Sequence, residues 1–206
     1  MSRLDHLVLA TRELDRTVDW VAQTLGVRPA PGGRHPGAGT RNFLLSLGPG
    51  HYLEVIGPDP DQPEPAVPRW FLIDVIDRPR LTAWVASSNR LEEDVARAAE
   101  HGYDLGPIDA RSRTTPEGEV LRWRMTRRRH SDVAIVPTLI DWGTTRHPSA
   151  TAPGGASLVS FRAEHPDVDR VTTVLAALSL DLELTTGEEP RLFAEISGPA
   201  GRLTLS

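Results

Sequence analysis

Short apolar runs alternate with polar, Gly- and Pro-rich stretches along the whole of this chain, and the spacing of the apolar positions changes from run to run. Residues 4–10 show the two-residue period of a strand, which places His6 and Val8 on one face and Asp5 on the other. Apolar positions over residues 14–25 instead recur at the spacing of a helix face. The chain is therefore predicted to start with a strand followed by a helix.

A glycine-rich loop and a β-hairpin are predicted after this helix. Residues 32–42 read Gly-Gly-Arg-His-Pro-Gly-Ala-Gly-Thr-Arg-Asn, and the two apolar runs that follow are separated only by the Gly-Pro-Gly turn at 48–50. This punctuation leaves no room for a helix and is typical of a hairpin. The second apolar run carries one carboxylate, Glu54, among apolar neighbours. With a short strand before the loop, these elements form a β-α-β-β-β unit.

The same order of elements recurs twice further along the chain. The apolar positions of the first helix reappear at a constant spacing in a second unit, and those of the opening hairpin reappear near the C-terminus. Connectors rich in Pro and Gly separate the units. The sequence thus predicts an α+β protein of repeated βαβββ modules, with a first module at residues 1–60, a linker at 61–79, a second module at 80–145 and a third, shorter module at 146–206.

Composition and charge narrow the functions that this fold could serve. The chain has no Cys, so it has no disulfide framework and no thiolate nucleophile, and a bound metal would depend on His, Asp and Glu. The formal net charge of -5 argues against a nucleic-acid or anionic-membrane partner. No apolar run approaches the ~20 residues of a membrane span, and no secretory leader is visible, so we expect a cytoplasmic protein. All 23 basic residues are Arg, which suggests a GC-rich bacterial source.

The repeated unit, the glycine-rich stretch at 32–42 and the Tyr-Leu-Glu run that ends at Glu54 resemble the glyoxalase-like branch of the vicinal oxygen chelate superfamily. The resemblance implies a curled mixed sheet around a cavity. It also implies a divalent metal (Zn, Fe, Mn, Ni or Mg; otherwise no cofactor), with ligands from the first and last strands of each module. Carried over to this chain, His6 is the first-strand ligand, and Glu54 is the last-strand ligand and the catalytic residue.

The other two modules lack the matching pair of ligands. At the positions that correspond to His6 and Glu54, they carry Ala83, Ile140, Ser160 and Thr204. Asp141 lies one residue out of register and could serve as a further metal ligand if its strand is bulged. Two protein ligands hold a catalytic metal poorly, because such sites commonly use three. True lactoylglutathione lyase activity is therefore not expected.

Further polar and aromatic residues are candidates for substrate binding. His35, Arg34 and Asn42 belong to the glycine-rich stretch, where they either bind a ligand or hold the turn together by hydrogen bonds. Trp84 and Trp123 lie on predicted strands, where large aromatic side chains either fill a core or line an apolar pocket. The sequence leaves both alternatives open.

Two functions fit these observations. The first is a metal-dependent enzyme of the lyase, isomerase or dioxygenase type that acts on a small organic molecule, with the metal as Lewis acid. The second is a metal-free protein that binds or sequesters a small molecule, as resistance-type members of the superfamily do. Neither function involves nucleic acid or a membrane. Because modules pair and this chain has an odd number of them, we also expect a homodimer.

Overall fold

The computed structural model describes residues 3–115, 118–127 and 133–206. The first module consists of β1 (Arg3–Ala10), α1 (Leu14–Leu25), β2 (Ala30–His35), β3 (Thr40–Ser46) and β4 (Tyr52–Pro58). The second consists of β5 (Arg80–Ser87), α2 (Leu91–Glu100), β6 (Ile108–Thr114), β7 (Val120–Thr126) and β8 (Thr138–Asp141). After the short 3-10 helix η1 (Pro148–Ala150), the third comprises β9 (Ser157–His165), α3 (Val168–Ala177), β10 (Glu183–Thr186), β11 (Arg191–Ser197) and β12 (Arg202–Leu205).

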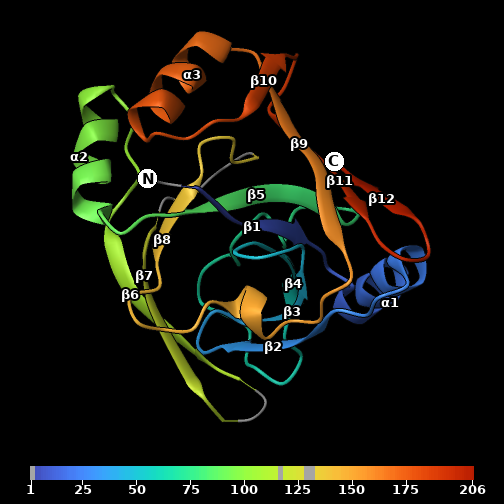
Figure 1. Ribbon diagram of the computed structural model, residues 1–206. Helices are drawn as coiled ribbons and strands as arrows, with labels where there is room; N and C mark the ends of the chain where they lie inside the picture. Colours follow the sequence, from blue (N-terminus) through green and yellow to red (C-terminus); the bar gives the residue numbers. More distant parts are fainter. Residues whose placement is uncertain (1–2, 116–117, 128–132) are drawn as a thin grey trace.

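The first two modules close into one barrel with the strand order β1-β4-β3-β2-β6-β7-β8-β5 (Figure 1). They join where β1 pairs with β5 and where β2 meets β6, both antiparallel. Within each module the first strand pairs in parallel with the last strand, β1 with β4 and β5 with β8. The predicted α+β fold, with repeated modules whose mixed sheet curls around a cavity, is confirmed.

The third module forms a separate four-stranded sheet, β10-β9-β11-β12, against the outside of the barrel. Figure 1 shows β9, β11 and β12 beside the barrel close to α1, with α3 and α2 next to each other at another edge. Apolar side chains of this sheet, such as Leu192 and Ile196, share the main hydrophobic core with Trp84 of β5. The third module therefore covers part of its own chain's barrel, and the homodimer stays a prediction.

Alternation along β1 and β4 sends side chains to two different cores. Leu7 and Leu53 point outward into the main core, which the helices and the third module cover. Val8 and Ile56 belong instead to a smaller cluster inside the barrel. His6 and Glu54 have the same parity as these inward residues, so the strand pattern directs both toward the barrel interior. Among the described residues, no helix combines the length and the apolar character that crossing a membrane requires.

Candidate functional site

The barrel interior contains a small cavity of about 40 Å³ near the inward side chains of β1 and β4. Its polar lining consists of His6, His35, Asn42, Glu54 and Arg113. Its aromatic lining consists of Tyr52, Trp70, Phe71, Trp123 and Trp142. Ionisable groups and large apolar surfaces therefore meet in one concave space, which is the usual composition of a small-molecule site.

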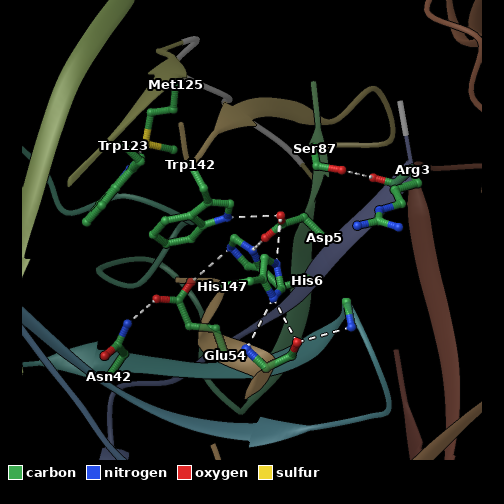
Figure 2. A network of polar contacts seen from close by, with 12 residues as sticks. Arg3, Asp5, His6, Asn42, Glu54, Ser87, Trp123, Met125, Trp142 and His147 are labelled. Atoms are coloured by element: carbon green, nitrogen blue, oxygen red, sulfur yellow. Dashed lines mark hydrogen bonds and ion pairs between the residues drawn. The ribbon is translucent and has the colours of Figure 1, made fainter. Parts of the chain in front are cut away.

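His6 and Glu54 come together because of the parallel pairing of β1 and β4. In this register His6 lies opposite Tyr52 and Val8 lies opposite Glu54, so the two polar residues are diagonal neighbours on the inward face. His6 Nε2 and Glu54 Oε2 are 3.6 Å apart, and the two residues are only 5% and 6% exposed. The ring of Tyr52 stacks on the ring of His6 with centroids 4.5 Å apart. The sequence-predicted pair thus shares one site (Figure 2).

Asp5 orients His6, although strict alternation predicts that the two face opposite ways. A register shift between β1 and β5 falls between Leu4 and His6, which leaves Asp5 as the extra residue of a β-bulge. The carboxylate of Asp5 is fully buried and accepts a hydrogen bond from His6 Nδ1 at 2.7 Å. With Nδ1 directed at Asp5, Nε2 is the ring nitrogen that faces Glu54.

Two more donors reach the carboxylate of Asp5 from the chain after β8. Trp142 Nε1 donates to Asp5 Oδ2 at 3.0 Å, and His147 Nε2 approaches the same oxygen at 3.1 Å. Because His147 Nδ1 accepts a hydrogen bond from the backbone N–H of Ser149, its proton lies on Nε2 and points at Asp5. Burial alone would raise the pKa of Asp5, but the hydrogen bonds from His147 and His6 outweigh it and lower the pKa to about 2.

Asn42 and His35 hold the other side of the site. Asn42 Nδ2 donates to Glu54 Oε1 at 2.5 Å, which leaves Oε2 as the oxygen that faces His6. Asn42 fits there because Gly32 has no side chain: a β-carbon at that position would lie 2.4 Å from Asn42 Oδ1. His35 Nδ1 is 2.9 Å from Thr40 Oγ1, and burial lowers the pKa of His35 although Glu54 opposes the shift. The ring of His35 is therefore neutral at pH 7.

The structure does not bring three of the sequence-predicted residues to the cavity. Arg34 is exposed and forms ion pairs with Asp59 and Asp61. Trp84 is 1% exposed, donates through Nε1 to Ile135 O at 2.7 Å and packs between the barrel and the third module, so it fills the core. Asp141 ends β8 and accepts a hydrogen bond from the backbone of Gly143.

Asp141 lines an open groove of about 430 Å³ together with the exposed Arg122. This groove adjoins the cavity, because Trp123 and Trp142 line both. The predictions that do reach the cavity are His6, His35, Asn42, Glu54 and Trp123. The site also contains residues that were not among the predicted site residues, which are Asp5, Tyr52, Trp70, Phe71, Arg113, Trp142 and His147. Asp5 lies next to His6, and Tyr52 lies two residues before Glu54 on the same face of its strand, so both positions carried a local signal. Nothing local in the sequence identified Arg113 or His147 as members of the site.

A divalent metal is the cofactor that the resemblance implies. His6 Nε2 and the carboxylate of Glu54 are suitable donors, and a His held by a carboxylate through its other nitrogen is common at metal centres. Catalytic sites of this kind nevertheless use three protein ligands. Within residues 3–115, 118–127 and 133–206, no group of three His, Cys, Asp or Glu side chains could hold a metal ion. The described donors therefore do not fit a three-ligand centre.

Comparisons with known proteins agree with this architecture. A family model described as a glyoxalase-like domain matches residues 4–179. The solved structure of a hypothetical protein from Staphylococcus aureus is similar over 100% of this chain and 86% of its own, with a TM-score of 0.64 at 13% identity.

Two methylmalonyl-CoA epimerases are similar over part of this chain. The enzyme from Mycobacterium tuberculosis is 17% identical over 67% of this chain and 85% of its own, with a TM-score of 0.41. The enzyme from Streptomyces coelicolor is 18% identical over 68% of this chain and 96% of its own, with a TM-score of 0.45. A search of curated proteins found no match.

The paired βαβββ modules around an internal cavity are the fold expected from the resemblance to the vicinal oxygen chelate superfamily. Within it, the chain belongs to the glyoxalase-like domain family, whose model spans the whole barrel and extends to Ser179. The family resemblance seen in the sequence is thereby confirmed.

Proposed function

We propose that this chain is an enzyme that moves a proton on a small organic molecule in the barrel cavity, with His6 and Glu54 as the acid–base pair. The observation that carries the proposal is the 3.6 Å approach of His6 Nε2 to Glu54 Oε2 inside a cavity. Two basic groups this close compete for one proton when they are buried. A molecule that enters meets one group that can remove a proton and a second that can return it.

The surrounding hydrogen bonds decide which atoms exchange the proton. Asp5 stays ionised because its pKa is lowered to about 2, so it holds the Nδ1 proton of His6 and stabilises the ring when Nε2 becomes protonated. Asn42 occupies Oε1 of Glu54 and leaves Oε2 free. Nε2 of His6 and Oε2 of Glu54 are therefore the two atoms that accept and release the proton. A reaction of this kind fits the lyase and isomerase types expected from the resemblance.

A metal-dependent form of the same function, including the dioxygenase type, needs a ligand beyond His6 and Glu54. Metal analysis of protein purified without chelators separates the two forms. A stoichiometric divalent metal that is lost in both His6→Ala and Glu54→Ala would favour the metal-dependent enzyme. Protein that transfers protons after treatment with EDTA would favour the acid–base pair alone.

The aromatic walls favour a second candidate function. Trp123 and Trp142 lie with ring centroids 5.2 Å apart, and Trp70 and Phe71 come from the connector after β4. Such surfaces suit a metal-free protein that binds or sequesters an aromatic compound without converting it. That function predicts thermal stabilisation by aromatic compounds, insensitive to EDTA, in the absence of any turnover.

Exchange of protons with solvent tests the enzyme without knowledge of its natural substrate. Small carbonyl compounds with acidic C–H bonds are incubated with the protein in D₂O, and deuterium incorporation is followed by NMR. The wild type is expected to catalyse exchange on at least one compound, and His6→Ala and Glu54→Gln to lower the rate by about 10²-fold or more.

Exposed residues near the end of α2 provide matched controls. His101→Ala and Glu100→Gln remove the same side-chain types from solvent-facing positions and are expected to keep the wild-type exchange rate. Exchange that survives both His6→Ala and Glu54→Gln would overturn the assignment of the acid–base pair. Location in the cytoplasm, a bacterial source and a homodimer remain proposals from the sequence alone.

A further inference from the structure

Arg113 of β6 is the charged residue of the cavity that the proposed proton transfer does not use. It lines the cavity and is only 5% exposed. In the part of the chain that the structure describes, its guanidinium makes no hydrogen bond and no ion pair. A guanidinium offers five N–H donors and keeps its positive charge. No nitrogen of Arg113 is among the fully buried polar atoms that lack a partner, so the guanidinium reaches the cavity. Its acceptors there are water or a bound ligand, because the described part of the protein supplies none.

The groups that face Arg113 do not supply this acceptor. Glu54 attracts the guanidinium electrostatically, whereas burial raises the pKa of Tyr52 and leaves its hydroxyl uncharged. The positive charge of Arg113 also lowers the pKa of His35. The oxygens of Glu54 are directed elsewhere, one to Asn42 and one toward His6. Burial lowers the pKa of Arg113, while Tyr52 and Glu54 only oppose that shift. The positive charge of Arg113 is therefore only partly compensated.

The backbone next to Arg113 leaves room around the guanidinium. Gly33 of β2 has φ +145°, and a β-carbon there would lie 3.3 Å from Arg113 Nη1 and 2.6 Å from the carbonyl oxygen of Thr114. A residue without a side chain is thus required where β2 passes the guanidinium. The glycine-rich stretch contributes to the site by making space for Arg113, in addition to placing Asn42.

The size of the cavity and the charge of its wall decide which anionic group can bind beside Arg113. A volume of about 40 Å³ corresponds to roughly three water-sized positions, since one water needs about 10–15 Å³. A carboxylate has three heavy atoms and a planar shape that matches the fork of a guanidinium. A phosphate is tetrahedral and carries up to two negative charges, which the carboxylate of Glu54 on the same cavity wall repels. The cavity therefore suits a carboxylate better than a phosphate.

We infer that the cavity binds the carboxylate of a small organic acid on the guanidinium of Arg113. This inference rests on the proposed function, because it names the class of substrate that the acid–base pair would act on. Arg113 and Glu54 line the same cavity, so an acid held by its carboxylate presents its neighbouring carbon to His6 and Glu54. Proton transfer at the carbon next to a carboxylate or an adjacent carbonyl is the chemistry that this placement supports.

Pairs of small acids and their amides test the inference on the intact protein. Acetate and propionate are compared with acetamide and propionamide, which have the same shape without the charge, by saturation-transfer NMR at constant ionic strength. The wild type is expected to bind each acid at least about tenfold more tightly than its amide. Equal binding of acid and amide to the wild type overturns the inference and needs no variant.

Variants then identify the residue that binds the negatively charged carboxylate of the ligand. Arg113→Gln is expected to abolish the preference for the acid, and Arg113→Lys to retain part of it, because a lysine keeps the charge but not the fork. Arg122→Gln changes an exposed arginine that does not line the cavity, so it is the matched control and is expected to bind like the wild type. Acid preference that survives Arg113→Gln, or that is lost in Arg122→Gln, overturns the assignment.

Inorganic phosphate and proton exchange complete the test. Phosphate is expected not to displace propionate, and displacement at equal concentration would overturn the restriction to carboxylates.

Should Arg113→Gln fail to fold, Arg113→Lys and the acid–amide comparison on the wild type still test whether Arg113 binds the carboxylate. Deuterium exchange without acid preference would remove this inference and keep the acid–base pair. Acid preference without exchange on any compound would keep Arg113 as a carboxylate-binding residue and remove the proposed enzyme.

Discussion

The carboxylate of Asp5 accepts a hydrogen bond from the ring of the next residue, His6, at 2.7 Å. Neighbours in a regular strand point to opposite faces, so this contact exists only because β1 is bulged against β5 at this point. The bulge joins a buried anion to the histidine that faces Glu54. In doing so it fixes which nitrogen of His6 is available in the cavity.

Replacement of Asp5 by Asn tests this relationship directly. The amide keeps the shape of the side chain but removes the charge that holds the Nδ1 proton and stabilises protonated His6. We expect Asp5→Asn to lower the rate of deuterium exchange by at least about tenfold and to move the basic limb of its pH profile. A purely structural role of Asp5 would lower the thermal stability without changing the shape of the pH profile.

The pH dependence of unfolding in acid tests the lowered pKa of Asp5 without any measurement of activity. Because the pKa of Asp5 is lowered from 3.8 to about 2 in the folded protein, ionised Asp5 stabilises the fold. This contribution is fully present above pH ~4 and is lost as the pH falls toward about 2, and by linkage it amounts to about 2 kcal/mol.

The measurement is urea unfolding at several pH values between 2 and 5. The difference in unfolding free energy between the wild type and Asp5→Asn should shrink as the pH falls through this window. His35, whose pKa is lowered by burial, is present in both proteins, so its titration cancels in this difference. A free-energy difference that stays constant from pH 5 to pH 2 would contradict the lowered pKa of Asp5.

The fold could be predicted from the sequence because local patterns carry it. The two-residue period of β1 and β4, the helix stripes and the repeated turns all indicate βαβββ modules, and the same period places His6 and Glu54 on one face. The site could be predicted only in part, because its remaining members depend on features that periodicity does not contain. The bulge at Asp5 is set by pairing with β5, and His147 reaches Asp5 from a connector 142 residues away in sequence.

The connector after β4 is a second case in which composition was not sufficient. Its proline-rich sequence predicts a linker, yet Trp70 and Phe71 line the cavity. They are held there because Arg69 donates to Gly39 O at 3.0 Å and to Asp74 Oδ1 at 2.7 Å, which fixes the connector on the barrel. These contacts join segments that are distant in the sequence, so no local pattern signals them.

The space beside Asn42 gives a prediction for Gly32. A β-carbon at position 32 would lie 2.4 Å from Asn42 Oδ1 and 2.8 Å from Leu44 Cγ, so Gly32→Ala must displace at least one of them. We expect a loss of about 1–3 kcal/mol in stability and, because Asn42 moves away from Glu54, a slower deuterium exchange. Gly154→Ala is the control, since nothing lies within 4 Å of the added carbon, and it should change stability by less than about 0.5 kcal/mol.

Substitution of Trp84 tests whether this residue packs the core or binds a ligand, the two alternatives that the sequence leaves open. Its indole donates to Ile135 O at 2.7 Å and meets Phe161 of the third module with ring centroids 5.4 Å apart. Trp84→Phe removes the donor and part of the packed volume, so we expect the free energy of urea unfolding to fall by about 2–3 kcal/mol.

Binding of propionate should stay unchanged while the protein is folded, because Trp84 does not line the cavity. Trp20→Phe, at a 40% exposed position on α1, is the matched control and should cost less than about 0.5 kcal/mol. Weaker propionate binding by Trp84→Phe at full stability would instead place this residue in the ligand site.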